Sequence, residues 1–207
     1  MASAATLRAG GGGRNVLADH VRLPVTSVAA DVALVLGGVL LLAAATQIRI
    51  PLGFTPVPLT GQTFAVLLVG AGLGPMRGGL SVLLYVLVGL AGAPVFTNGG
   101  SGIGHLIGAT GGYLVGFVIA SVLAGAFARR RFDRRVGTAV IAMSLASLVI
   151  YACGVLGLMV ATGASIPRAL ELGVLPFLVV DAVKVLLAAA VLPAAWIAVP
   201  DIERGRR

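Results

Sequence analysis

The chain has few charged residues and a single cysteine, and both shortages limit what it can be. Asp, Glu, Lys and Arg make up 11% of its 207 residues, against about 25% in a typical soluble domain. Cys153 has no second cysteine for an intramolecular disulfide or a thiolate cluster. The two histidines, His20 and His105, lie far apart and belong to no His-Glu-x-x-His pattern. We therefore expect neither a metal site nor a cofactor.

The motifs of ATP hydrolysis and of common hydrolases are also missing. Lys184 is the only lysine and is followed by Val185, so no Gly-x-x-x-x-Gly-Lys-Ser/Thr loop is present to bind phosphates. The sequence has no Gly-x-Ser-x-Gly turn, and its serines stand singly without an evident base. We therefore expect no catalytic residues and no enzyme activity. By itself the chain cannot hydrolyse ATP through such a loop.

Apolar sequence is abundant. Hydrophobic residues make up 58% of the chain, and the mean hydropathy is +1.07. Six segments approach the ~20 apolar residues that a bilayer-spanning helix needs. These segments are 28–46, 62–76, 78–94, 109–128, 137–161 and 174–197. The sequence therefore predicts an all-α integral membrane protein with six transmembrane helices, in one membrane domain over residues 28–199.

The two ends of the chain are expected to lie outside this domain. Residues 1–27 are rich in alanine and glycine, with a glycine run at 10–13, which predicts a disordered cytoplasmic tail. A cleaved signal peptide is the alternative, but the leader before a cleavage site would be unusually long. Residues 200–207 form a short basic tail, also expected to be cytoplasmic.

The basic residues gather near the ends of the predicted helices. The formal net charge of +8 could attract nucleic acid, but positions beside apolar segments are better explained by membrane topology and contact with anionic lipids. The run at 129–135, Arg77 and both tails should all lie on the cytoplasmic side. Six spans with both termini inside satisfy these requirements together. We therefore expect membrane lipids, and no nucleic acid, as partners of these arginines.

Two charged residues fall inside an apolar segment. Asp181 and Lys184 are three residues apart in the sixth predicted helix, so they project from neighbouring faces. A charge at membrane depth costs at least ~2.5 kcal/mol on insertion scales. The pair either locks the helix to its neighbours or binds a polar solute, and both interpretations stay open. A lysine suits a carboxylate, and an aspartate suits the N–H groups of an amide or urea.

Two loops on the predicted outer side are poor in charge. Residues 47–61 contain three prolines, and residues 94–108 are rich in glycine. Each loop also has a phenylalanine, Phe54 in the first and Phe96 in the second. Loops of this kind can close over a pocket, and ordinary connections between helices are the alternative.

The first predicted helix carries a ridge of small residues. Ala29, Ala33 and Gly37 recur at intervals of four, a spacing that lets two membrane helices approach closely. The ridge therefore either receives a helix of a partner protein or packs inside the chain's own bundle.

Five segments, in the same order along the chain, resemble the BioY family, the substrate-binding S components of energy-coupling-factor biotin transporters. The segments are TPVPLTGQ (55–62), GLGPMRGG (72–79), LYVLVGLAGAPVF (84–96), TGGYLVGF (110–117) and LPFLVVDAVK (175–184). The resemblance implies a compact six-helix S-component bundle in the bacterial cytoplasmic membrane, with a biotin pocket near the outer face.

The resemblance also implies a set of pocket residues. Carried onto this sequence, they are Thr60, Gln62, Phe96, Asn98, Tyr113, Asp181 and Lys184, with Arg49 and Phe54 as further candidates. Asp181 and Asn98 would then meet the ureido ring of biotin. Lys184 would neutralise the valerate carboxylate, with help from Arg49. Phe54, Phe96 and Tyr113 would cover the apolar ring and chain.

S components resemble one another in working with a transmembrane T component and two ATPases. On that resemblance, the ridge of Ala29, Ala33 and Gly37 is the expected docking face. The alternatives are an S component for another vitamin with a carboxylate, and a structural subunit or small pore in which Asp181 and Lys184 only hold helices together. An intramembrane enzyme is a third alternative, but no nucleophile–base pair supports it.

Overall fold

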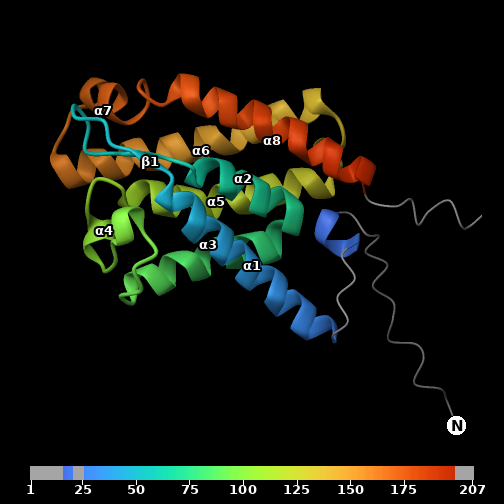
Figure 1. The fold of residues 1–207 in the computed structure, drawn as a ribbon. Helices are drawn as coiled ribbons and strands as arrows, with labels where there is room; N and C mark the ends of the chain where they lie inside the picture. The colour runs from blue at the N-terminus through green and yellow to red at the C-terminus, as the bar shows by residue number, and fades with distance from the viewer. Residues whose placement is uncertain (1–15, 21–25, 199–207) are drawn as a thin grey trace, which may run out of the picture.

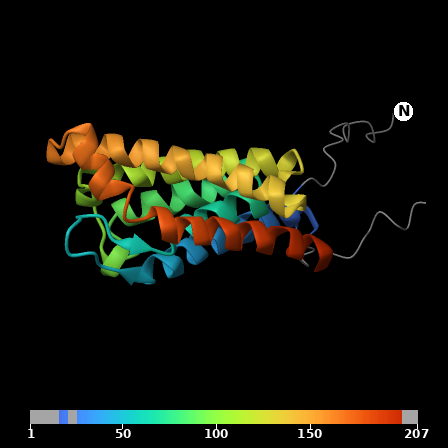
Figure 2. The same ribbon diagram turned by 90° about the horizontal axis from the view of Figure 1, so that it is seen from above.

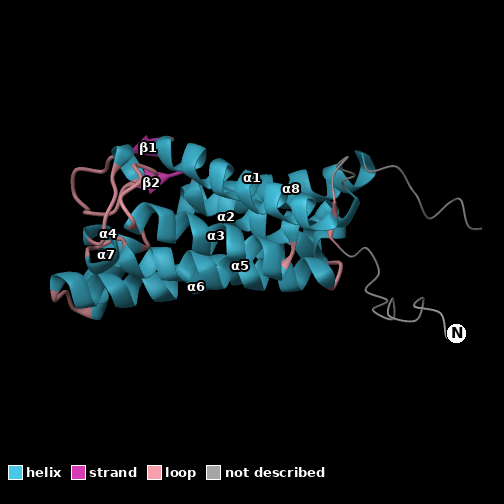
Figure 3. Cartoon of the chain, turned by 90° about the horizontal axis from the view of Figure 1, so that it is seen from below, coloured by secondary structure: helices cyan, strands magenta, loops and turns pink. Residues whose placement is uncertain are grey.

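The computed structural model describes residues 16–20 and 26–198, and α-helices dominate this part of the chain (Figures 1 and 3). The helices are α1 (Ser27–Gln47), α2 (Gln62–Leu73), α3 (Pro75–Leu90), α4 (Gly104–Ile107), α5 (Gly111–Arg129), α6 (Val136–Thr162), α7 (Ile166–Gly173) and α8 (Leu178–Ala198). Three short 3-10 helices are η1 (Leu17–His20), η2 (Thr97–Gly99) and η3 (Phe132–Arg134). Two short strands, β1 (Arg49–Ile50) and β2 (Leu59–Thr60), pair antiparallel.

The six predicted apolar segments form α1, α2, α3, α5, α6 and α8. These helices make up the body of an elongated bundle, which α1 crosses obliquely (Figures 1 and 2). Four of these helices, α1, α5, α6 and α8, are long and apolar enough to cross a membrane. The other two, α2 and α3, are apolar but shorter. The prediction of an all-α bundle is thus confirmed, and the spanning length expected of all six helices is met by four.

The turn between α2 and α3 sets where α2 ends and where α3 begins. Segments 62–76 and 78–94 were expected to be helical, but α2 ends at Leu73 and α3 already ends at Leu90. Gly74 has a φ of 86°, a conformation that glycine adopts without a steric penalty. Pro75 follows as the first residue of α3, where its missing N–H costs no hydrogen bond. A single residue therefore reverses the chain.

Helix α5 lies at the centre of the bundle and packs against α2, α3 and α6. Its contact with α6 depends on glycine at the crossing point. A Cβ added to Gly157 would lie 2.5 Å from the Cα of Gly112, and one added to Gly112 would collide with the Cys153 carbonyl. The two backbones therefore touch directly, as small residues allow in membrane helices.

One end of the bundle, here called the tail end, gathers the segments that the arginine pattern assigned to the cytoplasm (Figure 1). Arg77 at the start of α3 forms ion pairs of 2.8 Å with both Asp19 of η1 and Asp31 of α1. Trp196 near the end of α8 donates a 2.6 Å hydrogen bond to Asp133 in the loop between α5 and α6. These contacts place the predicted cytoplasmic segments on one side of the protein.

Helix η1 lies within the segment that was expected to be a disordered tail. Val16 and Ala18 are buried, and Asp19 is held by Arg77. That expectation is therefore wrong for residues 16–20, which dock through two apolar side chains and an ion pair. The remaining residues before 26, and the predicted tail at 200–207, lie outside the described residues.

The opposite end of the bundle, here called the pocket end, carries the β-hairpin, η2, α4 and α7 (Figures 1 and 3). The sequence prediction contained none of these short elements. The last helix was expected from residue 174, but α8 begins at Leu178, beyond Pro176. Asp181 consequently lies in the first turn of α8, where the positive end of the helix dipole favours an anion.

Candidate ligand-binding site

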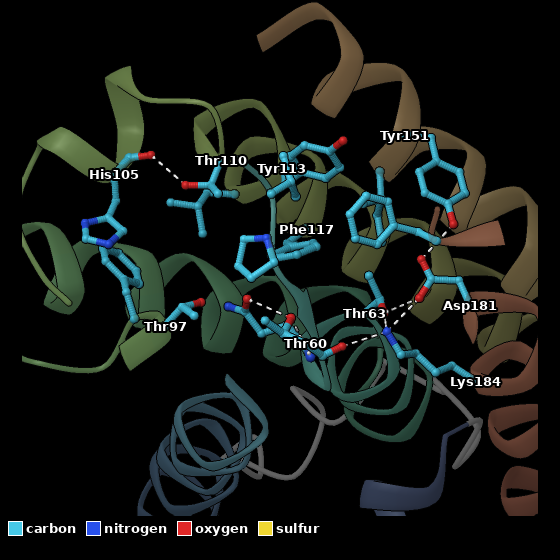
Figure 4. A pocket seen from close by; sticks show the side chains of 17 residues that line it. Thr60, Thr63, Thr97, His105, Thr110, Tyr113, Phe117, Tyr151, Asp181 and Lys184 are labelled. Atoms are coloured by element: carbon cyan, nitrogen blue, oxygen red, sulfur yellow. Dashed lines mark hydrogen bonds and ion pairs between the residues drawn. The ribbon is translucent and has the colours of Figure 1, made fainter. Parts of the chain in front are cut away.

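A cavity lies at the pocket end, between the loops at 47–61 and 94–108 and helices α2, α5, α6 and α8 (Figure 4). Its apolar lining consists of Val57, Pro58, Phe96, Leu114, Phe117, Ile150 and Phe177. Its polar lining consists of Thr60, Gln62, Thr63, Thr97, His105, Thr110, Tyr113, Tyr151, Asp181 and Lys184. An apolar pocket with a few placed polar groups is typical of small-molecule sites.

Lys184 is fully hydrogen-bonded at one end of this cavity. Its ammonium group donates to the Thr60 carbonyl at 2.6 Å, to the Thr63 hydroxyl at 2.9 Å and to Asp181 Oδ1 at 2.6 Å. The side chains of Lys184 and Asp181 are only 12% and 10% exposed. Three acceptors match the three N–H groups of a lysine, so the buried cation is satisfied.

Asp181 joins two further helices to this cluster. Its Oδ1 accepts a 3.1 Å hydrogen bond from Thr63 of α2, and its Oδ2 accepts a 2.7 Å hydrogen bond from Tyr151 of α6. The pair therefore does hold helices together, as one interpretation of the sequence proposed. It also faces the cavity, so the other interpretation fits as well.

The pair occupies a single end of the cavity. The sequence analysis assigned the two residues to opposite ends of a ligand, with Asp181 at the ureido ring and Lys184 at the carboxylate. Their charged atoms lie 2.6 Å apart, a separation much shorter than an extended vitamin. Two groups this close can face only one end of an extended ligand.

A second polar group lies across the cavity from the pair (Figure 4). It consists of His105 of α4, Thr97 of η2 and Thr110 before α5. The Thr110 hydroxyl donates to the His105 carbonyl at 3.3 Å, and His105 Nδ1 lies 3.2 Å from the carbonyl of Ser101. Aromatic side chains, including Tyr113 and Phe117, lie between the two polar groups.

The aromatic walls are fixed by specific contacts. The Phe96 ring is buried and packs edge-on against Tyr85, with ring centroids 5.6 Å apart. Gly89 leaves the space for it, because a Cβ at that position would collide with the Phe96 ring. The Tyr113 hydroxyl donates a 2.6 Å hydrogen bond to the Gly173 carbonyl at the end of α7.

The structure brings six of the nine predicted pocket residues to the cavity wall: Thr60, Gln62, Phe96, Tyr113, Asp181 and Lys184. Arg49, Phe54 and Asn98 do not line it. Arg49 is exposed on β1, and Phe54 is 64% exposed in the loop that follows. Asn98 is exposed in η2 with a φ of 63°, a turn conformation that asparagine tolerates.

Several cavity residues were missed by the sequence analysis. Thr63 and Tyr151 complete the coordination of Asp181 and Lys184, and each lies in a segment that was predicted to be an apolar helix. A polar side chain in such a segment was the available signal for both. His105 was noted only as a loop residue, because nothing local in the sequence places it over the cavity.

Among residues 16–20 and 26–198, no group of His, Cys, Asp and Glu side chains is arranged to hold a metal ion. The lining of the cavity provides groups for hydrogen bonding and for apolar contact. It offers one balanced ion pair, several hydroxyl groups, a carboxamide and an imidazole to a ligand with polar ends and an apolar middle.

Comparison with known proteins gives consistent matches. A sequence model described as the BioY family matches residues 17–201. The chain is 42% identical over 156 residues to the "Probable biotin transporter BioY" of Pyrococcus horikoshii, covering 75% of this chain and 90% of that one. It is 37% identical over 153 residues to the "Biotin transporter BioY" of Thermotoga maritima, covering 73% and 86%.

A solved structure shares the fold. It is the crystal structure of "the S-component for biotin from an ECF-type ABC transporter", which superposes with a TM-score of 0.71 at 23% sequence identity. The match covers 82% of this chain and 94% of that one. The bundle with its short helices at the pocket end is therefore an S-component fold.

Proposed function

Because the chain belongs to the BioY family, we propose that it binds biotin as the substrate-binding subunit of an energy-coupling-factor transporter. It is a multi-pass protein of the cytoplasmic membrane, and its named relatives are transporters and not enzymes. The observation that carries the proposal is the cavity itself. It has a balanced Asp181–Lys184 pair at one end, aromatic walls, and hydroxyl and imidazole groups at the other.

The pair suits the ureido ring of biotin. A cyclic urea is neutral and presents N–H donors beside a carbonyl acceptor. Asp181 and Lys184 are together neutral, and the acceptor and donor that now bond to each other at 2.6 Å can be shared with such a ring. A ligand carboxylate at this end would meet the negative charge of Asp181 as well as the lysine. We therefore place the ureido ring here, in place of the lysine–carboxylate contact expected from the sequence.

The carboxylate then lies at the far end, near Thr97, His105 and Thr110, whose hydroxyl and imidazole groups can donate hydrogen bonds. The positive-inside rule assigns the tail end to the cytoplasm, because it carries Arg77 and the run at 129–135. The cavity accordingly opens towards the outside, where biotin is captured.

The energy for transport is proposed to come from a T component with two ATPases, docked on α1. Ala29, Ala33 and Gly37 are exposed along one face of α1, and a Cβ at Gly37 would meet no atom within 4 Å. The neighbouring Gly38 faces inward, since its Cβ would lie 2.5 Å from the Ser81 hydroxyl. This exposure supports docking of a partner helix over packing within the chain's own bundle.

Calorimetry of the purified protein tests the proposed ligand. Biotin and desthiobiotin should both bind, because both carry the ureido ring and the carboxylate. Other vitamins with a carboxylate should release no heat at the same concentrations. Binding of another vitamin without biotin would move the chain to a different substrate, and no binding of any of them would favour a purely structural role for the ion pair.

A further inference from the structure

Tyr85 lies directly behind the cavity wall and does not line the cavity. It belongs to α3, and its side chain is completely buried. Its hydroxyl oxygen lies 2.9 Å from the Thr46 hydroxyl of α1, 2.8 Å from Gln62 Nε2 of α2 and 3.1 Å from the Val95 carbonyl. One phenol thus joins three helices and the loop that holds Phe96.

In the arrangement of the structure, the single hydrogen of this hydroxyl has two acceptors, Val95 and Thr46. The Val95 carbonyl can only accept it. Thr46 uses its own hydrogen on the Leu42 carbonyl, 2.7 Å away, so the Thr46 oxygen is also an acceptor towards Tyr85. With Gln62 Nε2 towards Tyr85, the phenol hydrogen can go to the Val95 carbonyl while Nε2 donates to the Tyr85 oxygen. A turned amide would take that hydrogen onto its own oxygen and leave the Val95 carbonyl without it.

This arrangement favours one orientation of the Gln62 carboxamide, because it keeps a donor on the Val95 carbonyl. With Nε2 directed at Tyr85, the carbonyl oxygen of Gln62 faces the Thr60 side, where it accepts from the Thr60 hydroxyl at 3.3 Å. The hydrogen of Thr60 is spent in that bond. Both side chains line the cavity, so this edge offers oxygen lone pairs from Thr60 Oγ1 and Gln62 Oε1.

We propose that Tyr85 is a positioning residue that makes the Thr60–Gln62 edge a hydrogen-bond acceptor and thereby selects a ligand with an N–H group at this place. The inference rests on the proposed function, in which that group is a ureido N–H of biotin. The edge adjoins the ureido end of the cavity, because the Thr60 carbonyl also accepts from Lys184 at 2.6 Å.

Removing the Tyr85 hydroxyl should change this preference without removing the ring. In Tyr85→Phe the aromatic contact with Phe96 is retained. Gln62 Nε2 loses its buried acceptor, and a donor without a partner favours rotation of the amide. The rotated amide presents N–H in place of C=O, so the edge accepts ligands with an oxygen where biotin has N–H.

The test compares biotin with its two cyclic-carbamate analogues, in each of which one ureido N–H is replaced by a ring oxygen of nearly the same size. The wild-type protein should prefer biotin over one analogue by roughly tenfold or more, since mismatched buried hydrogen-bonding groups reject a ligand strongly. Tyr85→Phe should reduce this ratio to about threefold or less. The matched control, Thr46→Val, should keep the wild-type ratio, because Tyr85 can still donate to the Val95 carbonyl.

Gln62→Leu provides a second route to the same answer if Tyr85→Phe does not fold. Gln62→Leu should reduce the preference for biotin over the analogue as much as Tyr85→Phe does. The variant that carries both substitutions should reduce it no further than either one alone. The inference is overturned if Tyr85→Phe weakens both ligands by the same factor, if Gln62→Leu keeps the ratio, or if the two effects add. It is also overturned if wild-type protein binds biotin without discrimination, whereas absence of biotin binding in the wild type rejects the proposed function itself.

Discussion

A buried lysine keeps its charge at low cost only when each N–H group has an acceptor and a negative charge lies close by. Lys184 meets both conditions through Thr60, Thr63 and Asp181. The cluster is therefore complete before a ligand arrives. A ligand that enters here has to share or replace existing hydrogen bonds, which favours a group that both donates and accepts.

Replacing Lys184 distinguishes whether this residue contacts the ureido ring or the carboxylate of biotin. Lys184→Met should weaken biotin binding at least tenfold (~1.4 kcal/mol), because the ureido carbonyl loses its charged donor. It should weaken binding of biotinol, the alcohol analogue, by the same factor, since biotinol keeps the ureido ring. Calorimetry with both ligands measures this. Biotinol binding that is unaffected by the substitution would instead assign Lys184 to the carboxylate.

A second buried carboxylate lies at the tail end, and its titration should affect stability. The Asp133 side chain is 0% exposed. Burial raises the pKa of the Asp133 carboxyl, although the hydrogen bond from Trp196 and the charge of Arg134 oppose this. A folded-state pKa above the unfolded value stabilises the protein at low pH, and that contribution is lost as pH rises through the folded-state pKa.

Asp133→Asn should therefore become more favourable as the pH increases. The asparagine oxygen can still accept from Trp196 Nε1, but it has no charge to desolvate. We expect the Tm of the variant, relative to wild type, to be higher near pH 7 than near about pH 4. Thermal unfolding in detergent at both pH values measures the difference. A difference that is constant with pH would show that the carboxyl keeps the same pKa on folding.

At the scale of single residues, the sequence predicted the charged members of the site better than the neutral ones. Asp181 and Lys184 could be identified because a charge inside an apolar segment is costly and therefore rare. For Thr63 and Tyr151 the only signal is a hydroxyl group in an apolar segment, and this signal is weak because hydroxyl groups are common in membrane helices. Asn98 and Arg49 lie in loops, where the path of the backbone determines which side chains reach the cavity.

At the scale of elements, α5 and α6 are in direct backbone contact beside the cavity. Gly112 and Gly157 let the backbones touch, and the ring of Tyr113 packs where Gly154 has no side chain. This contact sets the position of the cavity wall, since Tyr113 and Tyr151 project from these two helices.

Adding a methyl group at this crossing should force the helices apart. Gly157→Ala should destabilise the protein by roughly 1–3 kcal/mol, the usual cost of overpacking a tight contact. Gly137→Ala is the matched control in the same helix, because a Cβ there would meet no atom within 4 Å. The control should be neutral or slightly stabilising, as alanine favours helix by about 1 kcal/mol over glycine. Equal Tm changes in the two variants would contradict the close approach.

The elements that the sequence predicted share one property, a long apolar run. Such runs identified α1, α5, α6 and α8 to within a few residues, because the bilayer sets their length. Helices α4 and α7 have only four and eight residues, so neither contains an apolar run of spanning length. Their positions depend on contacts with distant residues, such as the hydrogen bond from Tyr113 to Gly173.

At the scale of the whole molecule, the proposed docking face and the cavity are separate surfaces. Ala33→Leu should block recovery of the T component and ATPases in a co-purification, because the bulky side chain keeps a partner helix away from α1. Biotin binding should stay unchanged, since Ala33 lies in the half of α1 remote from the cavity. Ala152→Leu, an exposed alanine on α6, serves as the control and should leave both properties intact. Normal recovery with Ala33→Leu would place the docking face elsewhere.

Helix α7 has a consequence for the kinetics of ligand exchange. Its last two carbonyl groups hold two different parts of the site: Leu172 accepts a 2.7 Å hydrogen bond from Thr55 of the proline-rich loop, and Gly173 accepts from Tyr113 of the cavity wall. A displacement of α7 releases the loop and the wall together. Dissociation of a bound ligand should therefore follow a single exponential, with one opening event in place of two independent ones.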